Sequence, residues 1–336
     1  MKICVFGAGA IGGYLAVELS LAGHDVCVIA RGEHLSAIAS KGLTLRMAGI
    51  QKTAIVCASD DPSRFGPQDY VFCTLKSHQA YTAAPSMLPL LGADTAVVTA
   101  MNGIPWWYFY KEGSSFEGTH LSSVDPKGLQ WETIGPERAI GCVVDPACEV
   151  VEPGVIEHHE FNRFILGEPD RTKSKRVEAL SEIMRAANFD APIRDDIRYS
   201  VWLKLWGNVC FNPISALTLA TLDRITNEPS LRSLCVNCMH EAKAVSDAFG
   251  VQIDEAMIER RLAAAGRAVG HKMSMLQDFE RHRTVEIGAL VGAVQELARL
   301  KDVATPTIDV LLALVEERAT SEGLYERTSL LFPTSH

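Results

Sequence analysis

The chain has 336 residues, of which 47% are hydrophobic and 22% charged, and this is enough material for two globular domains. Its formal net charge is −9, and Lys and Arg form no block, which argues against nucleic acid or an anionic membrane as the main partner. A small anionic ligand stays compatible with this acidic chain, because positive charge can gather locally.

Cysteine usage and hydropathy indicate the compartment. The nine cysteines are scattered and odd in number, which favours a reducing compartment over a disulfide framework. No apolar run in the sequence approaches the ~18 residues of a membrane span, and a strand-like run directly after Met1-Lys2 leaves no room for a signal peptide. We therefore expect a cytoplasmic protein.

A glycine-rich loop follows the first expected strand. Residues 3–6 are apolar, residues 7–12 read G-x-G-x-x-G, and a helical pattern and a second apolar run at 26–30 come next. In this context the first glycine permits a tight turn, the second lets backbone N–H groups approach a pyrophosphate, and the third allows close helix–strand packing. The predicted dinucleotide loop consists of Gly7, Ala8, Gly9, Ala10, Ile11 and Gly12.

The end of the second expected strand indicates which dinucleotide is bound. NAD-binding proteins carry an acid there for the ribose 2′-hydroxyl, whereas this chain has Arg31. A guanidinium pairs with a 2′-phosphate through its planar fork. We therefore predict NADP(H) rather than NAD(H), with Glu33 as the residue that could reverse the preference if it pointed inward.

Strand-like runs then alternate with helical or turn segments. The expected strands cover residues 43–47, 53–57, 70–75, 95–99, 139–144, 154–167 and 192–194, and a helix is expected at 175–188. This alternation predicts a doubly wound, mostly parallel sheet, in which ligands bind beyond the carboxyl ends of the strands. Lys76 and Asn102 follow two such ends, so each could contact cofactor or substrate, or could equally cap a helix or loop.

Residues 104–135 break this alternation. Pro105 to Tyr110 is densely aromatic, and the remainder is polar and contains glycine. A loop of this length in a compact domain is usually functional or mobile. The aromatic part could be a lid or a pocket wall, and it could equally be a satellite core or an oligomer contact.

We predict no metal site. His158 and His159 are adjacent on an expected strand, so they face opposite sides and cannot bind one metal from the same face. Cys235 and Cys238 form the only C-x-x-C, which lies in a helical pattern without a second pair, so a structural role is favoured.

The second half of the chain has long helical patterns and few strand signals. Helices are expected at residues 197–210, 231–249, 254–269, 276–299 and 306–320. A boundary near Asp195 would therefore separate a Rossmann-type NADP-binding domain over residues 1–195 from an all-α domain over 196–336. Pro213 directly after Asn212 predicts a break in the first of these helices.

Three polar residues share one face of that first helix. Lys204, Asn208 and Asn212 lie four residues apart, so each is rotated by only about 40° from the one before it. The residues between them are largely apolar, and a cation and two amides in such a segment need partners if they are buried. These three could line a site, or they could cap neighbouring loops at a helix edge.

Two later residues could belong to the same site. Ser274 begins a helical pattern, where it could bind a ligand or act as a plain N-cap. Glu286 lies twelve residues later on the same continuing pattern, between two apolar neighbours. A carboxylate in that setting needs a cationic partner, and Lys204 is the obvious candidate.

Together these segments resemble the ketopantoate reductase (2-dehydropantoate 2-reductase) family over essentially the whole chain. The supporting stretches are residues 7–12, Thr74-Leu75-Lys76, Asn102-Gly103, Lys204 to Pro213, Ser274 to Asp278 and Thr284 to Ile287. The resemblance implies NADPH-dependent reduction of the ketone of 2-dehydropantoate, which gives pantoate for pantothenate synthesis.

The resemblance also implies catalytic and cofactor-binding roles. Lys204 would be the general acid, and Glu286 would hold and orient its ammonium group. Arg31 and Lys76 would face the cofactor phosphates. A lysine is protonated at pH 7 unless it is heavily desolvated, so it can supply the proton that the developing alkoxide needs.

The substrate would be bound by neutral side chains and by Lys204 itself. Asn208, Asn212 and Ser274 would contact it, with Ser274 nearest its carboxylate, and Asn102 would lie where cofactor and substrate meet. The chain departs from many family members after Asn102-Gly103, where it lacks a second glycine, and in the length of residues 104–135. Both departures concern the side-chain end of the substrate.

Two alternative functions follow. A paralogue could reduce another branched or aromatic 2-oxo acid with the same residues. A non-catalytic NADPH sensor would lack catalytic groups, whereas Lys204 and Glu286 are both present. In each case we expect a small-molecule ligand and neither nucleic acid nor a membrane as partner, and the helical half could form a homodimer.

Overall fold

In the computed structural model, which describes residues 1–327, the chain forms two compact units. The first unit contains Met1–Thr119 and Gly128–Ser200, and the second contains His120–Lys127 and the chain from Val201 onward. Residues 104–135 thus contribute to both units. The expected division into domains at residues 195 and 196 stays a prediction.

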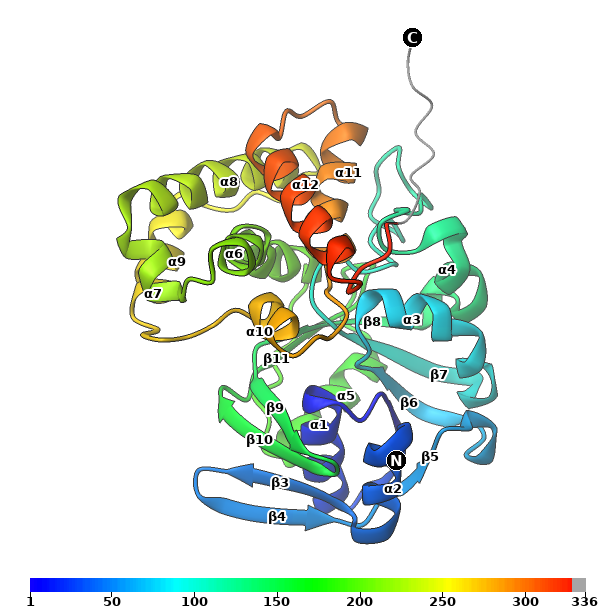
Figure 1. Cartoon of the computed structure of the whole chain (residues 1–336). Coiled ribbons are helices and arrows are strands. Elements are labelled where there is room, and N and C mark those ends of the chain that lie inside the picture. Colours follow the sequence, from blue (N-terminus) through cyan, green and yellow to red (C-terminus); the bar gives the residue numbers. More distant parts are fainter. Residues whose placement is uncertain (328–336) are drawn as a thin grey trace. The chain divides into compact units, whose positions relative to one another are not determined.

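The first unit, all of which is described, is built on a seven-stranded sheet (Figure 1). Its strands, in spatial order, are β11 (Phe164–Gly167), β8 (Ala139–Val144), β7 (Leu91–Ala100), β6 (Gln68–Cys73), β1 (Lys2–Phe6), β2 (Asp25–Ile29) and β5 (Cys57–Ser59). All neighbours pair in parallel except β11, which is antiparallel to β8. The predicted Rossmann-type, mostly parallel sheet is confirmed.

The strand order reverses beside β1. From β1 the chain first adds β2 and β5 on one side and then returns to add β6, β7 and β8 on the other. Ile3, Val5 and Phe72 are buried in the middle of this sheet, as the continuous apolar runs of its parallel strands require. In such a sheet the ligand crevice lies at the carboxyl ends of the strands on either side of the reversal, here β1 and β6.

Helices lie between these strands in the chain, and one more follows the last strand. They are α1 (Ala10–Leu21), α2 (Gly32–Lys41), α3 (Ser77–Ala83), α4 (Leu129–Ile134) and α5 (Lys175–Ala186), with short 3-10 turns η1 (Pro62–Arg64), η2 (Ala84–Leu90) and η4 (Pro136–Arg138). Helix α5 begins after Ser174, whose hydroxyl accepts the Val177 N–H as an N-cap. It ends before Asn188, which has a positive φ of 66°.

A second sheet of four strands was not predicted. Its order is β4 (Ile50–Ala54), β3 (Leu43–Met47), β10 (Val155–Glu160) and β9 (Ala147–Glu152). Figure 1 shows these strands gathered beside α1. A Cβ on Gly13 of α1 would lie 2.6 Å from the Ile156 side chain of β10, so this glycine allows the small sheet to pack closely on the helix.

Three predicted strands differ from the structure. Residues 53–57 do not form one strand, because Ala54 ends β4 in the small sheet and Cys57 begins β5 in the large one. Residues 154–167 divide into β10 and β11, with Phe161 between them at a φ of 60°. The expected strand at 192–194 is reduced to a single bridge between Ile193 and Leu166. The boundaries follow from the pairing partners, since β4 pairs with β3 in the small sheet whereas β5 and β11 pair with β2 and β8 in the large one.

The aromatic segment packs inside the first unit. Trp106, Trp107, Tyr108 and Phe109 are all at most 3% exposed, and Trp107 donates its ring N–H to Thr99 Oγ1 at 2.9 Å. This burial favours the satellite-core alternative for the aromatic residues over a lid.

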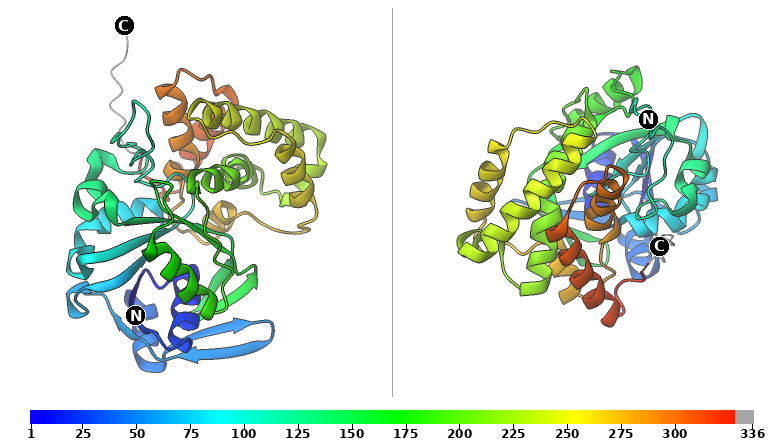
Figure 2. Two further views of the ribbon diagram at one scale, coloured as in Figure 1. Left: turned by 180° about the vertical axis from the view of Figure 1, so that it is seen from behind. Right: turned by 90° about the horizontal axis from the view of Figure 1, so that it is seen from above.

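The regular structure described in the second unit is helical, as predicted. Its helices are α6 (Ile197–Thr218, with its first residues in the first unit), α7 (Leu222–Asn227), α8 (Pro229–Ala248), α9 (Ala256–Gly266), α10 (Ser274–Glu280), the π-helical turn η5 (Gly288–Gly292), α11 (Ala293–Leu300) and α12 (Pro306–Ser321). Figure 2 shows α8, in yellow-green, running beside the orange and red helices α11 and α12.

The predicted break at Pro213 is wrong, because α6 continues through this proline to Thr218. Proline has no N–H to donate to the carbonyl four residues earlier, which is that of Val209. The thiol of Cys238 on α8 donates to this carbonyl oxygen at 3.8 Å. A tertiary contact therefore compensates for the missing helical bond, and it gives one member of the C-x-x-C pair a structural role.

The predicted continuous helix over residues 276–299 is also wrong. Helix α10 ends at Glu280, residues 283–287 have no helical structure, and the helix resumes at η5. His282 has a positive φ of 48°, and the Val285 N–H donates to Leu324 O at 3.0 Å instead of to its own chain segment. Glu286 therefore lies in an irregular segment and not on a helix.

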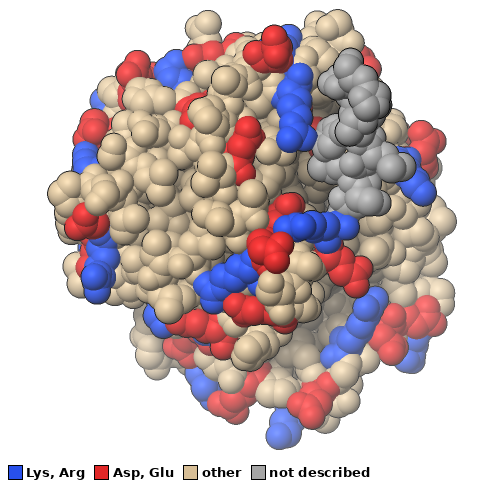
Figure 3. Space-filling model, turned by 45° about the horizontal axis from the view of Figure 1, so that its top comes forward, with Lys and Arg blue, Asp and Glu red and all other residues tan. Residues whose placement is uncertain are grey.

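The described residues contain no helix long and apolar enough to cross a membrane. On the face shown in Figure 3, Lys and Arg are interspersed with Asp and Glu.

Candidate functional site

The glycine loop leads from β1 into α1 and is held by backbone and side-chain hydrogen bonds. Gly7 has a φ of 113°, and the N–H groups of Gly7 and Ala8 both donate to Ile29 O at the end of β2. Thr74, directly after β6, donates its hydroxyl to Gly7 O at 2.5 Å. The tight turn predicted at Gly7 is therefore present, and the neighbouring strands hold its shape.

Gly12 and Gly9 differ in what surrounds them. A Cβ on Gly12 would lie 2.6 Å from Thr74 Oγ1 and 2.9 Å from Val5 Cγ1, and it would overlap Gly7 O. A Cβ on Gly9 would meet no atom within 4 Å. Gly12 is thus required by the packing of the protein itself, whereas the space in front of Gly9 is left open.

This open space lies at the N-terminus of α1. Gly9 is the N-cap residue and provides no side-chain cap, and the first turn contains no acidic residue. The first-turn N–H groups of a helix lack intrahelical partners and carry partial positive charge. The loop and helix end therefore fit the pyrophosphate of a dinucleotide.

The other predicted cofactor residues follow neighbouring strands of the same sheet. Arg31 follows β2 as the exposed N-cap residue of α2, and Glu33 is exposed in its first turn. Lys76 follows β6 as the half-buried N-cap residue of α3. Burial, and then the charge of Lys76, lowers the pKa of His78 to about 4, so His78 is neutral at pH 7.

Asn102 follows β7 and has a buried polar atom to satisfy. Its Oδ1 is shielded from solvent and has no hydrogen-bond partner among residues 1–327. Leaving a buried amide oxygen without a donor costs about 1–3 kcal/mol, so a donor on a bound ligand would be stabilising here. The carboxyl edge of the sheet thus carries the glycine loop, Arg31, Lys76 and Asn102.

The polar column on α6 is present as predicted. Lys204 and Asn208 are half-buried, whereas Asn212 is only 1% exposed. Asn208 makes no side-chain hydrogen bond in the described part of the chain, so its amide can donate to and accept from a ligand.

Asn212 joins α6 to α10. Its Oδ1 accepts hydrogen bonds from Ser274 Oγ and from the Met275 N–H, both at 3.2 Å. The N-cap residue of α10 is Met273, so the simple N-cap alternative for Ser274 is wrong. Asn212 therefore caps α10 from another helix and holds Ser274 beside the polar column.

Glu286 belongs to the irregular segment after α10. It is half-buried between Val285 and Ile287, which are at most 1% exposed. Hydrophobic packing on both sides fixes the backbone at this carboxylate. Its expected pairing with Lys204 stays a prediction.

Arg261 was missed at the sequence level. From α9 it donates Nη2 to Lys204 O at 3.0 Å, and a Cβ on Gly207 would lie 3.2 Å from this Nη2. Gly207 shares the helix face of Lys204 and Asn208, so the guanidinium lies beside the polar column. The available signal was Gly207 itself, because glycine inside a helix costs about 1 kcal/mol relative to alanine and calls for a packing reason.

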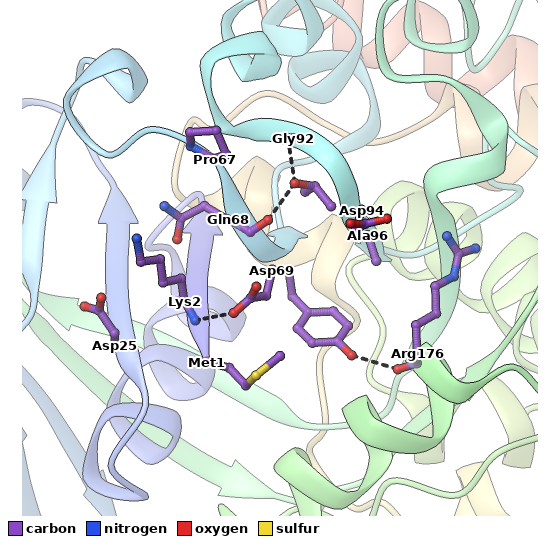
Figure 4. A pocket seen from close by; sticks show the side chains of 12 residues that line it. Met1, Lys2, Asp25, Pro67, Gln68, Asp69, Gly92, Asp94, Ala96 and Arg176 are labelled. Atoms are coloured by element: carbon purple, nitrogen blue, oxygen red, sulfur yellow. Dashed lines mark hydrogen bonds between the residues drawn. The ribbon is translucent and has the colours of Figure 1, made fainter.

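A separate cavity of about 770 Å³ lies at the amino ends of the strands (Figure 4). Met1, Lys2, Asp69 and Arg176 are among its lining residues, and the Lys2 N–H donates to Asp69 Oδ2 at 2.7 Å. Dinucleotides bind at the opposite edge of such sheets, so this cavity is not the candidate site. Among the described residues, no cluster of His, Cys, Asp and Glu could hold a metal ion.

Comparison with known proteins decides the family. The profile of ketopantoate reductase PanE/ApbA matches residues 3–171, and that of its C-terminal part matches residues 196–319. A 2-dehydropantoate 2-reductase of Mesorhizobium japonicum is 51% identical over 326 residues, which are 97% of this chain and 100% of that protein. The chain belongs to the ketopantoate reductase family.

Similar solved structures support this family assignment. A Ralstonia solanacearum protein assigned to the ketopantoate reductases has 40% sequence identity and a TM-score of 0.91, covering 96% of this chain and 99% of that one. D-mandelate dehydrogenase, solved with NADH and anilino(oxo)acetate, shares the fold at 20% identity and a TM-score of 0.84, covering 97% and 100%. As a member of the ketopantoate reductase family, the chain is an NAD(P)-dependent oxidoreductase that acts on CH–OH groups.

Proposed function

We propose that this ketopantoate reductase family member reduces 2-dehydropantoate to pantoate with NADPH, as a step of pantothenate synthesis. The single observation that supports this substrate assignment is the 51% identity to the Mesorhizobium japonicum 2-dehydropantoate 2-reductase over 97% of the chain. The glycine loop and the polar column on α6 supply residue types that this reaction needs.

Two charged side chains near the end of β2 bear on the cofactor preference. Arg31 is exposed there, at the N-cap of α2, where a guanidinium can pair with a ribose 2′-phosphate. Glu33 is exposed as well and is free to turn toward solvent, so it need not oppose a phosphate. These positions support NADPH over NADH.

Lys204 is proposed as the general acid. When bound, the reduced nicotinamide supplies a hydride to the carbonyl carbon of the substrate. The ketone oxygen then develops negative charge, and the Lys204 ammonium donates a proton to it. Glu286 would keep this lysine protonated and oriented, because a nearby carboxylate favours the charged form of an amine.

Neutral donors on α6 and α10 would bind the rest of the substrate. Asn208 can use its whole amide, whereas Asn212 can offer only its Nδ2, since its Oδ1 holds α10. The Ser274 hydroxyl points its proton at Asn212 and would have to rotate to donate to a carboxylate. Asn212 Oδ1 would keep its bond from the Met275 N–H after this rotation.

A steady-state assay with several 2-oxo acids tests the proposal. NADPH oxidation would be followed with 2-dehydropantoate, 2-oxoisovalerate, phenylglyoxylate and phenylpyruvate at equal concentrations. The highest kcat/KM with 2-dehydropantoate would support the proposal. Preference for another acid would instead indicate a paralogous reductase, and the fold allows this because D-mandelate dehydrogenase shares it. Tight NADPH binding without oxidation of any substrate would indicate a sensor.

The cellular setting is part of the same proposal. All nine cysteines are free thiols, which suits a reducing cytoplasm. A homodimer is also expected, and light scattering on the purified protein measures its mass directly.

A further inference from the structure

His34 lies in the first turn of α2 and hydrogen-bonds to two other parts of the first unit. Its Nδ1 accepts the Gly154 N–H at 3.0 Å, and its Nε2 lies 2.6 Å from the carbonyl oxygen of Ala8 in the glycine loop. A backbone N–H can only donate, so Nδ1 carries no proton and the neutral ring is protonated on Nε2. His34 therefore donates to Ala8 O.

Gly154 provides a fixed point for this imidazole. It forms the turn between β9 and β10 with a φ of 79°, and its carbonyl oxygen accepts the Thr44 N–H at 2.9 Å. A Cβ on Gly154 would lie 3.2 Å from Ala37 Cβ, so the turn packs closely against α2. The small sheet thus fixes one nitrogen of His34, and the other nitrogen holds the loop.

The bond from His34 acts on one of two loop carbonyls. Thr74 donates to Gly7 O and His34 donates to Ala8 O, so neighbouring side chains hold both oxygens. Carbonyl oxygens carry partial negative charge and would repel a pyrophosphate, whereas N–H groups attract it. The N–H groups of Gly7 and Ala8 donate to Ile29 O, so with these two carbonyls held, the N–H groups left for a pyrophosphate are those from Gly9 through the first turn of α1.

We propose that His34 is a positioning residue for the dinucleotide, which it serves by fixing the Ala8 carbonyl in place. The proposal rests on the proposed cofactor site and goes beyond it, because it gives a role to a side chain that does not bind the cofactor. It also makes a distinctive claim. His34 acts on the part of the loop that meets the pyrophosphate, so it supports NADPH and NADH equally, unlike Arg31.

The variants His34→Ala, His34→Gln and His34→Asn test this role, with dissociation constants for NADPH and NADH measured by fluorescence titration. His34→Ala removes both hydrogen bonds of the imidazole. His34→Gln carries an amide N–H at about the position of Nε2 and can still donate to Ala8 O. His34→Asn places its oxygen near Nδ1 and keeps the Gly154 bond, but it does not reach Ala8. We expect both dissociation constants to rise about 5- to 30-fold in the Ala and Asn variants and to stay within about threefold in the Gln variant.

The KM for the 2-oxo acid at saturating cofactor should be unchanged in all three variants. A general loss of structure would instead change this KM as well. Equal affinities in the Gln and Asn variants, or a loss confined to NADPH, would overturn the role of His34. If His34→Ala does not fold, the comparison of Gln with Asn decides. Wild-type protein that binds neither dinucleotide would overturn the proposed function, and this inference with it, whereas normal binding by wild type and all variants would overturn the inference alone.

Discussion

Alanine substitutions at Gly9 and Gly12 separate the space that the cofactor needs from the space that the protein itself fills. Gly9 has a φ of −68°, which alanine adopts readily, and its added Cβ would meet no protein atom within 4 Å. The Cβ of Gly12→Ala would overlap Gly7 O and lie 2.6 Å from Thr74 Oγ1. The same Gly→Ala change is therefore expected to affect cofactor binding at Gly9 and protein stability at Gly12.

The expected magnitudes follow from these surroundings. Gly12→Ala forces backbone to move, so the cost should reach the upper end of the range for overpacking, about 3 kcal/mol, and lower the Tm by about 6–12 °C. For Gly9→Ala, the poorer N-cap and the reduced entropy of the unfolded chain nearly cancel, so stability should change by less than about 1 kcal/mol. Its methyl group would instead displace charge-assisted bonds to the pyrophosphate, weakening NADPH binding about 10- to 100-fold.

Thermal unfolding without cofactor and fluorescence titration with NADPH measure the two effects separately. We expect Gly9→Ala to unfold like the wild type and bind NADPH weakly, and Gly12→Ala to lose stability. The reasoning would be refuted if Gly9→Ala bound NADPH with wild-type affinity, or if it lost as much stability as Gly12→Ala.

Three further substitutions address other parts of the chain. Arg31→Ala should weaken NADPH binding about 10- to 100-fold and leave NADH binding little changed in titrations, and an equal loss for both would contradict the 2′-phosphate contact. Ser274→Ala removes one of the two hydrogen bonds to Asn212 Oδ1, so the Tm should fall by at most about 2–4 °C. The KM for the 2-oxo acid should rise about tenfold, and an unchanged KM would remove Ser274 from the substrate site. Arg198 donates to the backbone carbonyls of Tyr108, Tyr110 and Pro169, and Arg198→Met leaves these carbonyls without their donor. Chemical denaturation should show that the free energy of unfolding falls by at least about 3 kcal/mol, and a fall below about 1 kcal/mol would contradict the stabilising role of these bonds.

Local patterns were sufficient for much of this structure. Gly7 needs glycine for its positive φ, and Gly12 needs it because a Cβ would overlap Gly7 O, five residues earlier, so the motif could be identified without coordinates. The bonds to Ile29 and Thr74 that hold the loop come from other strands and could not. The helical spacing of Lys204, Asn208 and Asn212 also predicted their shared face on α6. In both cases the hydrophobic pattern and the chemistry of the polar residues indicate the same local structure.

Long-range contacts account for what the sequence did not reveal. The small sheet pairs β3 with β10, more than a hundred residues later, and nothing in either strand specifies that partner. Helix α6 passes Pro213 because Cys238 satisfies the Val209 carbonyl. His34 resembles an ordinary helix residue until the folded chain brings it against Ala8, so its hydrogen bond could not be predicted.

The proton-donating role of Lys204 is the central claim, and single-turnover hydride transfer tests it most directly. NADPH absorbance would be followed after rapid mixing of the NADPH-loaded enzyme with 2-dehydropantoate, for wild type, Lys204→Ala and Lys204→Arg. Arginine keeps the positive charge but is a very weak acid, so both variants should be slower by roughly 10²- to 10⁴-fold while the Kd for NADPH stays within about twofold. Transfer at the wild-type rate in Lys204→Ala would contradict the account.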